Sequence, residues 1–234
     1  MISKNQINFF NKNGYLIVEN VIDDSVCDKF LKICKNYSEN NNENFTEILQ
    51  AHVKIPETLN FLKNSQIVDT IQTLLKGEAV GLQTVCSFKK YNTISAEYAW
   101  NPHQDNSYMQ SERNSYISGD VILDDHLEGT GRLYVYPGSH EEDLLPFEEN
   151  RSFDLKKGEN PGNRVIQIPE KYKKVELNLK KGSLLIFHSH LIHGSTKNIT
   201  KDKWRPILLM AYALKGIDFR QGRSAKRMPI DLQN

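Results

Sequence analysis

The sequence carries no excess of either charge. Its 30 basic and 29 acidic side chains give a formal net charge of +1. Without a strong positive charge, the chain as a whole is not attracted to the phosphates of nucleic acids or to anionic membrane surfaces. We therefore expect neither nucleic acid nor a membrane as a partner. The sequence leaves the oligomeric state open.

Cysteine and long apolar runs are also scarce. The chain has three cysteines, Cys27, Cys34 and Cys86, and no CxxC pair. This odd number argues against a disulfide framework and against a zinc site built from cysteines. The longest apolar run, Ile207 to Leu214, is too short to span a bilayer, and the polar first residues do not resemble a secretory signal. We expect reduced cysteines and a cytoplasmic protein.

The first third of the chain has the hydrophobic period of helices. We predict helices over residues 5–12, from Asp23 or Asp24 to about residue 37, and over 65–75, with a strand at 15–18 between the first two. In the second helix we expect one buried face, made of Val26, Phe30, Ile33 and Cys34. A run of asparagines near residues 40–44 is typical of a surface loop.

From about residue 80 the period changes to two, which is typical of strands. The predicted strands cover residues 80–89, 116–123, 133–136, 174–179, 184–188 and 205–214. Helices followed by many strands predict a single domain over residues 1–234, with a helical layer at about 1–78 on a β core at about 79–215. A charged insertion at about 141–172 is either a lid over the site or a loop without such a role.

The motif at residues 103–105, His-Gln-Asp, carries the chemistry. In an extended chain, residues two apart point the same way, so His103 and Asp105 can present an imidazole and a carboxylate to one point. The segment 187–195 offers a third ligand among His188, His190 and His193. Two histidines and a carboxylate form the facial triad of non-haem Fe(II) oxygenases, which leaves positions open for a bidentate cosubstrate and O₂. A zinc site or hydrogen-bonded core histidines are the alternatives.

Arg205, at the start of a predicted strand, strengthens the oxygenase hypothesis. A short loop would lay this strand antiparallel beside the preceding one and bring Arg205 near the metal. A guanidinium can hold the distal carboxylate of 2-oxoglutarate through two parallel hydrogen bonds, and Ser195 could add a hydroxyl donor. A cupin-like metalloenzyme without 2-oxoglutarate would not need Arg205, and a jelly-roll binding protein would not need the triad; Arg205 alone could also be a surface charge.

Four segments resemble the phytanoyl-CoA dioxygenase (PhyH) family of Fe(II)/2-oxoglutarate-dependent oxygenases. They are Phe10 to Val18 with its Gly-Tyr pair, the His103 to Tyr108 motif, the Gly131 to His140 segment ending in Pro-Gly-Ser-His, and Lys181 to Ser195. The resemblance covers nearly the whole chain. It implies a mainly β fold with N-terminal helices on a double-stranded β-helix (jelly-roll, cupin-like) core.

The same resemblance implies roles for individual residues. His103, Asp105 and His193 are expected to bind Fe(II), and Arg205 and Ser195 to hold the 2-oxoglutarate carboxylate. Lys89, or Lys90 in its place, is expected to face the cosubstrate, and Gln83 to line the pocket. The reaction expected is hydroxylation with release of succinate and CO₂. The carboxylate ligand Asp105 disfavours a halogenase, while desaturation, epoxidation and ring closure stay open.

Departures from the family pattern bear on the substrate. Arg132 lies where relatives often have an apolar or small residue, and it shares a strand face with Tyr134. If that face looks into the barrel, Arg132 favours an anionic substrate; otherwise it is a solvated side chain. Asn106, directly after the metal motif, is a further candidate for substrate contact. These residues favour a small polar or acidic metabolite, and we expect His140 to be structural.

Overall fold

The computed structural model describes residues 2–41, 47–91, 99–149, 164–222 and 225–233. Statements about structure below concern these residues. The predicted asparagine loop falls largely outside them, as do most of the segment between Lys89 and His103 and the middle of the predicted lid. Within these ranges, no helix has the length and apolar character that crossing a membrane requires.

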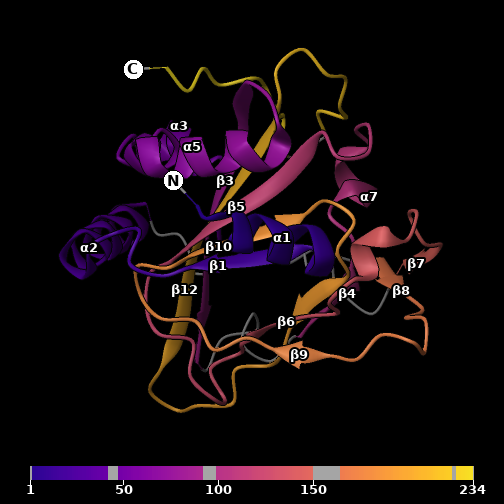
Figure 1. Ribbon diagram of the computed structural model, residues 1–234. Coiled ribbons are helices and arrows are strands. Elements are labelled where there is room, and N and C mark those ends of the chain that lie inside the picture. Colours follow the sequence, from indigo (N-terminus) through magenta and orange to yellow (C-terminus); the bar gives the residue numbers. More distant parts are fainter. Residues whose placement is uncertain (1, 42–46, 92–98, 150–163, 223–224, 234) are drawn as a thin grey trace.

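Two antiparallel sheets form the core (Figure 1). The larger sheet has six strands, in the order β1 (Tyr15–Val18), β10 (Leu184–His188), β5 (Tyr116–Ile122), β12 (Trp204–Leu214), β3 (Ala79–Lys90) and β2 (Glu47–Leu49). The smaller has four, in the order β4 (Trp100–His103), β11 (His193–Ser195), β6 (Leu133–Val135) and β9 (Val175–Glu176). A separate hairpin pairs β7 (Phe147–Glu149) with β8 (Arg164–Ile166). This is the jelly roll that the sequence predicts.

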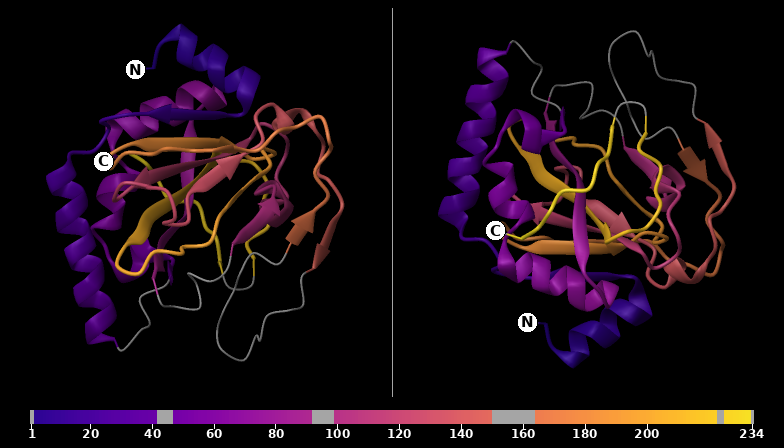
Figure 2. Two further views of the ribbon diagram at one scale, coloured as in Figure 1. Left: turned by 90° about the horizontal axis from the view of Figure 1, so that it is seen from below. Right: turned by 90° about the horizontal axis from the view of Figure 1, so that it is seen from above.

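The helices lie mostly on one side of the larger sheet, as both views of Figure 2 show. They are α1 (Lys4–Asn13), α2 (Asp24–Asn40), α3 (Ala51–Lys54), α4 (Thr58–Leu62) and α5 (Ser65–Leu75). A short α7 (Asn106–Met109) follows the metal motif, and a 3₁₀ turn covers Ser139–Glu141. The helices predicted at residues 5–12 and 65–75 and the strand predicted at 15–18 are confirmed as α1, α5 and β1, with ends within one residue of the prediction.

Side chains alternate along the strands between an outer face, which packs on the helices, and an inner face, which lies between the two sheets. On β12, Leu208, Met210 and Tyr212 belong to the core shared with the helices, whereas Ile207 packs in a second core with Leu133 and Val135 of the smaller sheet. Successive side chains of a strand point to opposite faces, so Arg205, Leu209 and Ala211 share the inner face with Ile207. The same parity turns Tyr116, Ser118 and Asp120 of β5 inward, and all of these inner residues line one cavity.

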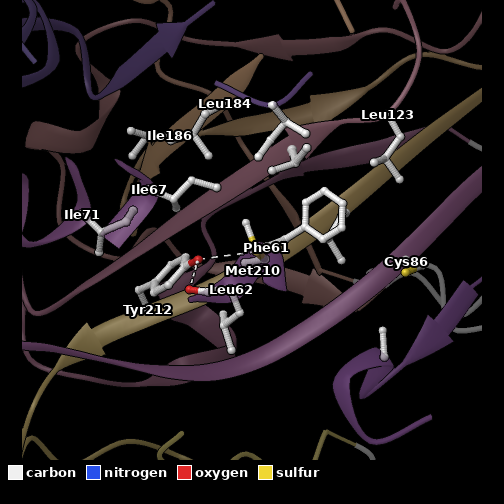
Figure 3. Packing of buried hydrophobic residues seen from close by; sticks show 14 of the residues in the cluster. Phe61, Leu62, Ile67, Ile71, Cys86, Leu123, Leu184, Ile186, Met210 and Tyr212 are labelled. Atoms are coloured by element: carbon white, nitrogen blue, oxygen red, sulfur yellow. Dashed lines mark hydrogen bonds between the residues drawn. The ribbon is translucent and has the colours of Figure 1, made fainter. Parts of the chain in front are cut away.

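Tyr212 ties the helical layer to the sheet. Its ring is fully buried, and its hydroxyl donates to the carbonyl oxygen of Leu62 in α4 at 3.1 Å, beside the sulfur of Met210 (Figure 3). Ile67 and Ile71 of α5 and Leu184 and Ile186 of β10 fill the space around it. This core therefore joins apolar residues that recur with the helical period in α5 to apolar residues that recur with the two-residue period in β10 and β12.

Two predictions about the fold are wrong. In α2, Val26 is 44% exposed, and the buried positions are Cys27, Phe30, Leu31 and Cys34. Phe30 and Cys34 are buried as expected and Ile33 is partly buried on the same core, so only Val26 lies off the face, which is turned toward Cys27 and Leu31. The strand carrying Arg205 does not pair with its predecessor; β12 lies between β3 and β5. The preceding predicted strand, β10, lies in the same sheet but is separated from β12 by β5, and a count of loop residues does not reveal this order. All three cysteines are free and buried, as expected.

The buried face of α2 predicts unequal effects of truncation at two positions one turn apart. Phe30→Ala removes a ring that is 2% exposed and packs at a tilt against the Phe61 ring, with 4.7 Å between the centroids, so it should lower the free energy of unfolding by about 3–5 kcal/mol. Val26→Ala, on the exposed side, should change it by less than about 0.5 kcal/mol. Urea unfolding followed by circular dichroism measures both; a Val26→Ala loss as large as that of Phe30→Ala would contradict this orientation of α2.

Candidate active site

Three side chains from two neighbouring strands converge at one end of the cavity. His103 ends β4, Asp105 follows it, and His193 begins β11, with His103 and His193 directly opposite each other in the ladder. Their ligand atoms all lie within 4.8 Å of one another. Gly194 allows this close approach, because a Cβ there would lie 2.5 Å from the carbonyl oxygen of Trp100 and from the Tyr134 hydroxyl.

Backbone carbonyls fix the orientation of both imidazoles. His103 Nδ1 lies 2.7 Å from Asn101 O, and His193 Nδ1 lies 3.0 Å from Leu191 O. A carbonyl can only accept, so each Nδ1 carries the proton and each Nε2 keeps a free lone pair. Both Nε2 atoms lie 3.6 Å from Asp105 Oδ1, which is too far for a hydrogen bond. Lone pairs and a carboxylate facing one point without a shared proton suit a divalent cation.

The protonation states agree with metal binding. Burial lowers the pKa of His193 to about 4, against an opposing effect of Asp105, so this imidazole is neutral at neutral pH. Burial alone would raise the pKa of Asp105. The nearby His193 and His103, with a hydrogen bond from Ser118, outweigh burial and hold that pKa well below its ordinary value. The site therefore presents a neutral imidazole at His193 and an ionised carboxylate at Asp105, which are the forms that bind metals.

Ser118 and Gln104 hold the metal motif in place. The Ser118 hydroxyl donates to Asp105 Oδ2 at 2.7 Å, and Tyr116 OH lies 2.9 Å from the same hydroxyl. The Gln104 amide, 1% exposed, donates to His190 O and accepts from Leu145 N. Gln104 therefore points away from the cavity and anchors the motif, so its two neighbours face inward. Ser118 was not predicted, because it lies on a strand without any motif.

Arg205, Ser195 and Lys89 meet farther along the cavity. Arg205 lies opposite Lys89 in the β3–β12 ladder, and Lys89 Nζ donates to Ser195 Oγ at 2.8 Å and to Thr196 O at 2.7 Å. Arg205 is 2% exposed and lines the cavity, and its Nε has no hydrogen-bond partner among the described residues. Burial lowers the pKa of Arg205 to about 10, so it stays charged at neutral pH. A buried cation with an unsatisfied donor requires an anionic partner.

Glu47 of β2 also lines this end of the cavity, and the sequence gave no sign of it. Burial raises the pKa of Glu47 to about 7, although Arg205 and Lys89 oppose the shift. Asp120, fully buried on the inner face of β5, has its pKa raised well above its usual value, first by burial and then by Asp105. Near neutral pH these carboxyls therefore neutralise Arg205 only in part.

Of the four residues predicted to contact the substrate, one lines the cavity and three do not. Gln83 lines the cavity, as predicted from the resemblance. Arg132 does not: its guanidinium donates to Asn178 at 2.6 Å and pairs with Glu176 at 2.8 Å, as on a solvated outer face. The Tyr134 hydroxyl donates to Trp100 O, and the Asn106 side chain bonds to Ser111. Arg132, Tyr134 and Asn106 do not line the cavity, and each contacts other residues of the protein, so their roles in substrate binding stay predictions without support from this geometry.

The remaining histidines near the motif have partners of their own. His188 Nε2 lies 2.8 Å from Asn114 Oδ1, and its Nδ1 accepts from the His190 backbone N–H at 3.1 Å. Both ring nitrogens are therefore engaged, and His188 is not a ligand. His140 Nε2 donates to Asn11 O, and its ring packs on Gly14, where a Cβ would lie 2.6 Å from the ring. His140 is structural, as expected.

Comparisons with known proteins agree with this geometry. The profile of the phytanoyl-CoA dioxygenase (PhyH) family matches residues 10–207. The chain is 23% identical over 232 residues to a probable phytanoyl-CoA dioxygenase of Caenorhabditis elegans, covering 86% of this chain and 72% of the relative. It is 30% identical over 152 residues to the phytanoyl-CoA dioxygenase of Arabidopsis thaliana, covering 64% of this chain and 50% of that relative.

Among solved structures, the epimerase SnoN in complex with Fe³⁺, alpha ketoglutarate and nogalamycin RO has the same fold. Its TM-score is 0.77 at 15% identity, covering 94% of this chain and 87% of the SnoN chain. This likeness confirms the jelly-roll fold, and the family match covers most of the chain. The chain belongs to the phytanoyl-CoA dioxygenase family of Fe(II)/2-oxoglutarate-dependent dioxygenases.

Proposed function

We propose that this protein is a hydroxylase of a small polar or acidic metabolite, with Fe(II) held by His103, Asp105 and His193 and 2-oxoglutarate as cosubstrate. The observation that carries the proposal is the pair of Nε2 lone pairs directed at one carboxylate oxygen without a proton between them. The three side chains would occupy one face of an octahedron and leave the cavity side open. The similar fold of SnoN was solved with Fe³⁺ and alpha ketoglutarate, which supports this choice of metal and cosubstrate.

The end of the cavity that Arg205 lines favours an enzyme that uses 2-oxoglutarate over a metalloenzyme that does not. A metal site alone does not require a buried guanidinium, yet Arg205 lines the same cavity with an unsatisfied Nε. We assign Arg205 to the distal carboxylate of 2-oxoglutarate, through the two-point geometry that guanidinium and carboxylate share. The Ser195 hydroxyl, held by Lys89, faces the same space. Its proton is free to turn toward the carboxylate because it accepts from Lys89.

Bound Fe(II) with 2-oxoglutarate supplies the oxidising chemistry of this enzyme class: O₂ is reduced, 2-oxoglutarate becomes succinate and CO₂, and a C–H bond of the substrate is hydroxylated. The chain itself provides position and a dry cavity. Asn101 O and Leu191 O hold the imidazoles, and Ser118 orients Asp105. The Phe187 ring stacks on His193 at 4.5 Å and excludes water from that side.

The proposal also covers the organisation and location of the protein. Both sheets enclose the same cavity, which supports a single oxygenase domain across the chain. Three free, buried cysteines support a reducing compartment such as the cytoplasm. The predicted lid at about 141–172 stays a hypothesis, with residues 150–163 outside the described ranges.

Replacing either His103 or Asp105 tests the proposed function. His103→Ala and Asp105→Ala should reduce the O₂-dependent conversion of 2-oxoglutarate to succinate to the rate of free Fe(II), because two ligands cannot hold a catalytic iron. Asp202→Ala, which removes an exposed carboxyl, is the matched control and should keep wild-type turnover. Circular dichroism checks that each variant folds. Full succinate production by either ligand variant would contradict the assignment.

Glu47 predicts a dependence of 2-oxoglutarate affinity on pH. Below its pKa of about 7 the carboxyl is neutral, so it does not compete with the cosubstrate for the charge of Arg205. Above that pH its negative charge faces the incoming carboxylate, so affinity should fall as pH rises from about 6.5 to about 8.5, by at most about tenfold per pH unit. Burial also lowers the pKa of Lys89, and loss of its charge would act in the same direction.

Glu47→Gln separates the two contributions. It removes the carboxylate and leaves Lys89, so the slope of affinity against pH should become shallower, and affinity near pH 8 should increase. Anaerobic titration of the Fe(II) protein with 2-oxoglutarate at several pH values gives the slope. An unchanged slope in Glu47→Gln would show that Glu47 does not act on this end of the cavity.

A further inference from the structure

A second guanidinium, that of Arg227, lines the same cavity as the metal motif. It comes from the irregular segment after β12, which no sequence pattern singled out. Its Nε donates to Gln83 Oε1 at 2.7 Å, and its Nη1 donates to Arg220 O at 3.1 Å. Among the described residues no carboxylate lies within ion-pair distance of it. Arg227 is thus oriented by neutral groups, and none of the described carboxylates forms an ion pair with it.

The backbone of this C-terminal segment holds Arg227 in place. Arg220 N donates to Met109 O of α7 at 2.7 Å, and Ile230 exchanges two backbone hydrogen bonds with Gly81 of β3. The segment, yellow in Figures 1 and 2, therefore crosses one end of the sheet between α7 and β3. Arg227 N also donates to Gln221 O at 3.0 Å. These contacts fix the side chain at the cavity in a defined position.

Strand register places Arg227 at the opposite end of the cavity from Arg205. Along β3, Lys89 faces Arg205 and Gln83 faces Ala211. Six residues of a strand span about 20 Å, so the anchor of Arg227 is far from the cosubstrate cations. Ser118, which orients Asp105, lies opposite Ala211 on the other side of β12. Arg227 is therefore on the metal side of the cavity, where a substrate must lie to be oxidised.

The electrostatics support this placement. Burial lowers the pKa of Arg227, while Tyr116 and Asp105 are close enough to raise it. A partly buried guanidinium without a paired carboxylate costs free energy unless an anion joins it. Gln83 accepts through its oxygen, so its amide N–H groups are available to the same anion. Tyr116 adds a hydroxyl to the wall.

We propose that Arg227, held by Gln83, binds a carboxylate of the primary substrate and so selects small acids over neutral molecules. The inference rests on the proposed function and narrows its substrate class. The cavity of about 240 Å³ must also hold the cosubstrate, which favours a small acid. The planar guanidinium matches a carboxylate through two parallel hydrogen bonds. The substrate would then extend from Arg227 toward the open side of His103, Asp105 and His193.

Binding of matched neutral and anionic probes tests the proposal. The probes are a series of small carboxylic acids, each paired with its primary amide and its phosphate-ester analogue. Anaerobic protein is loaded with Fe(II) and saturating 2-oxoglutarate, so that Arg205 is occupied and cannot bind the acids. Equilibrium dialysis then measures each affinity. We expect acids to bind about tenfold or more tightly than their amides, as a charged hydrogen bond implies.

Variants at Arg227 and at a neighbouring lysine identify the residue responsible. Arg227→Gln should weaken acid binding by about 10- to 100-fold, and Arg227→Lys, which keeps the charge, should weaken it less. Lys226→Gln, which removes an exposed cation of the same segment, is the matched control and should bind acids like the wild type. Equal losses in the Lys and Gln variants would indicate a structural role for Arg227 and overturn the proposal.

Other outcomes also decide the matter. Amides that bind as tightly as acids, acids that bind Arg227→Gln as tightly as the wild type, or no acid binding at all would each overturn the proposal. Preferred binding of the phosphate esters would overturn the choice of a carboxylate. Failure of the wild type to bind Fe(II) and 2-oxoglutarate in the loading step would instead contradict the proposed function, so the two failures are distinguishable.

Discussion

The metal centre depends on two hydrogen bonds from imidazole Nδ1–H groups to backbone carbonyls, and the rest of the cavity is arranged around that centre. They leave His103 and His193 with Nε2 lone pairs that face Asp105. The carbonyls belong to residues two positions earlier in each chain segment, so the orientation of each ring is encoded locally. The pairing of β4 with β11 then brings the two local arrangements together, and Gly194 permits the distance. Asp105 stays ionised there because His193, His103 and the Ser118 hydroxyl outweigh the effect of burial on its pKa.

Around that centre the inner faces of β3, β5 and β12 distribute charge along the cavity. Arg205, Lys89 and Glu47 gather at one end, and Arg227 with Gln83 at the other. The outer faces of the same strands are apolar and pack under α2, α4 and α5. Because side chains alternate along these strands, the apolar outer residues form the hydrophobic core that stabilises the sheet, and the polar inner residues point into the space between the sheets.

The sequence predicted what is encoded locally or by motif. The His103 and Asp105 pair, the helices predicted at 5–12 and 65–75 and most of the predicted strands follow from spacing, whereas the segment 174–179 is a strand only at Val175–Glu176. Arg205 followed from its place at the start of a predicted strand, and His193 was chosen among three histidines with the family resemblance. What failed depends on contacts distant in sequence. The pairing of β12 with β3 and β5 arises from a jelly-roll crossover, and Val26 against Cys27 is a matter of helix rotation that packing decides. Arg132 looked suitable on its strand, but Glu176 and Asn178 bind it. Glu47 and Arg227 lie where no periodicity or motif marks a residue.

The central claim is that His103, Asp105, His193 and Arg205 together hold Fe(II) and 2-oxoglutarate. Anaerobic visible spectroscopy of the purified protein, before and after each addition, tests it most directly. The account predicts a weak metal-to-ligand charge-transfer band that needs both Fe(II) and 2-oxoglutarate and that weakens at equal cosubstrate concentration in Arg205→Ala. Tight Fe(II) binding with no band would contradict the role of 2-oxoglutarate, and no Fe(II) binding would contradict the metal centre itself.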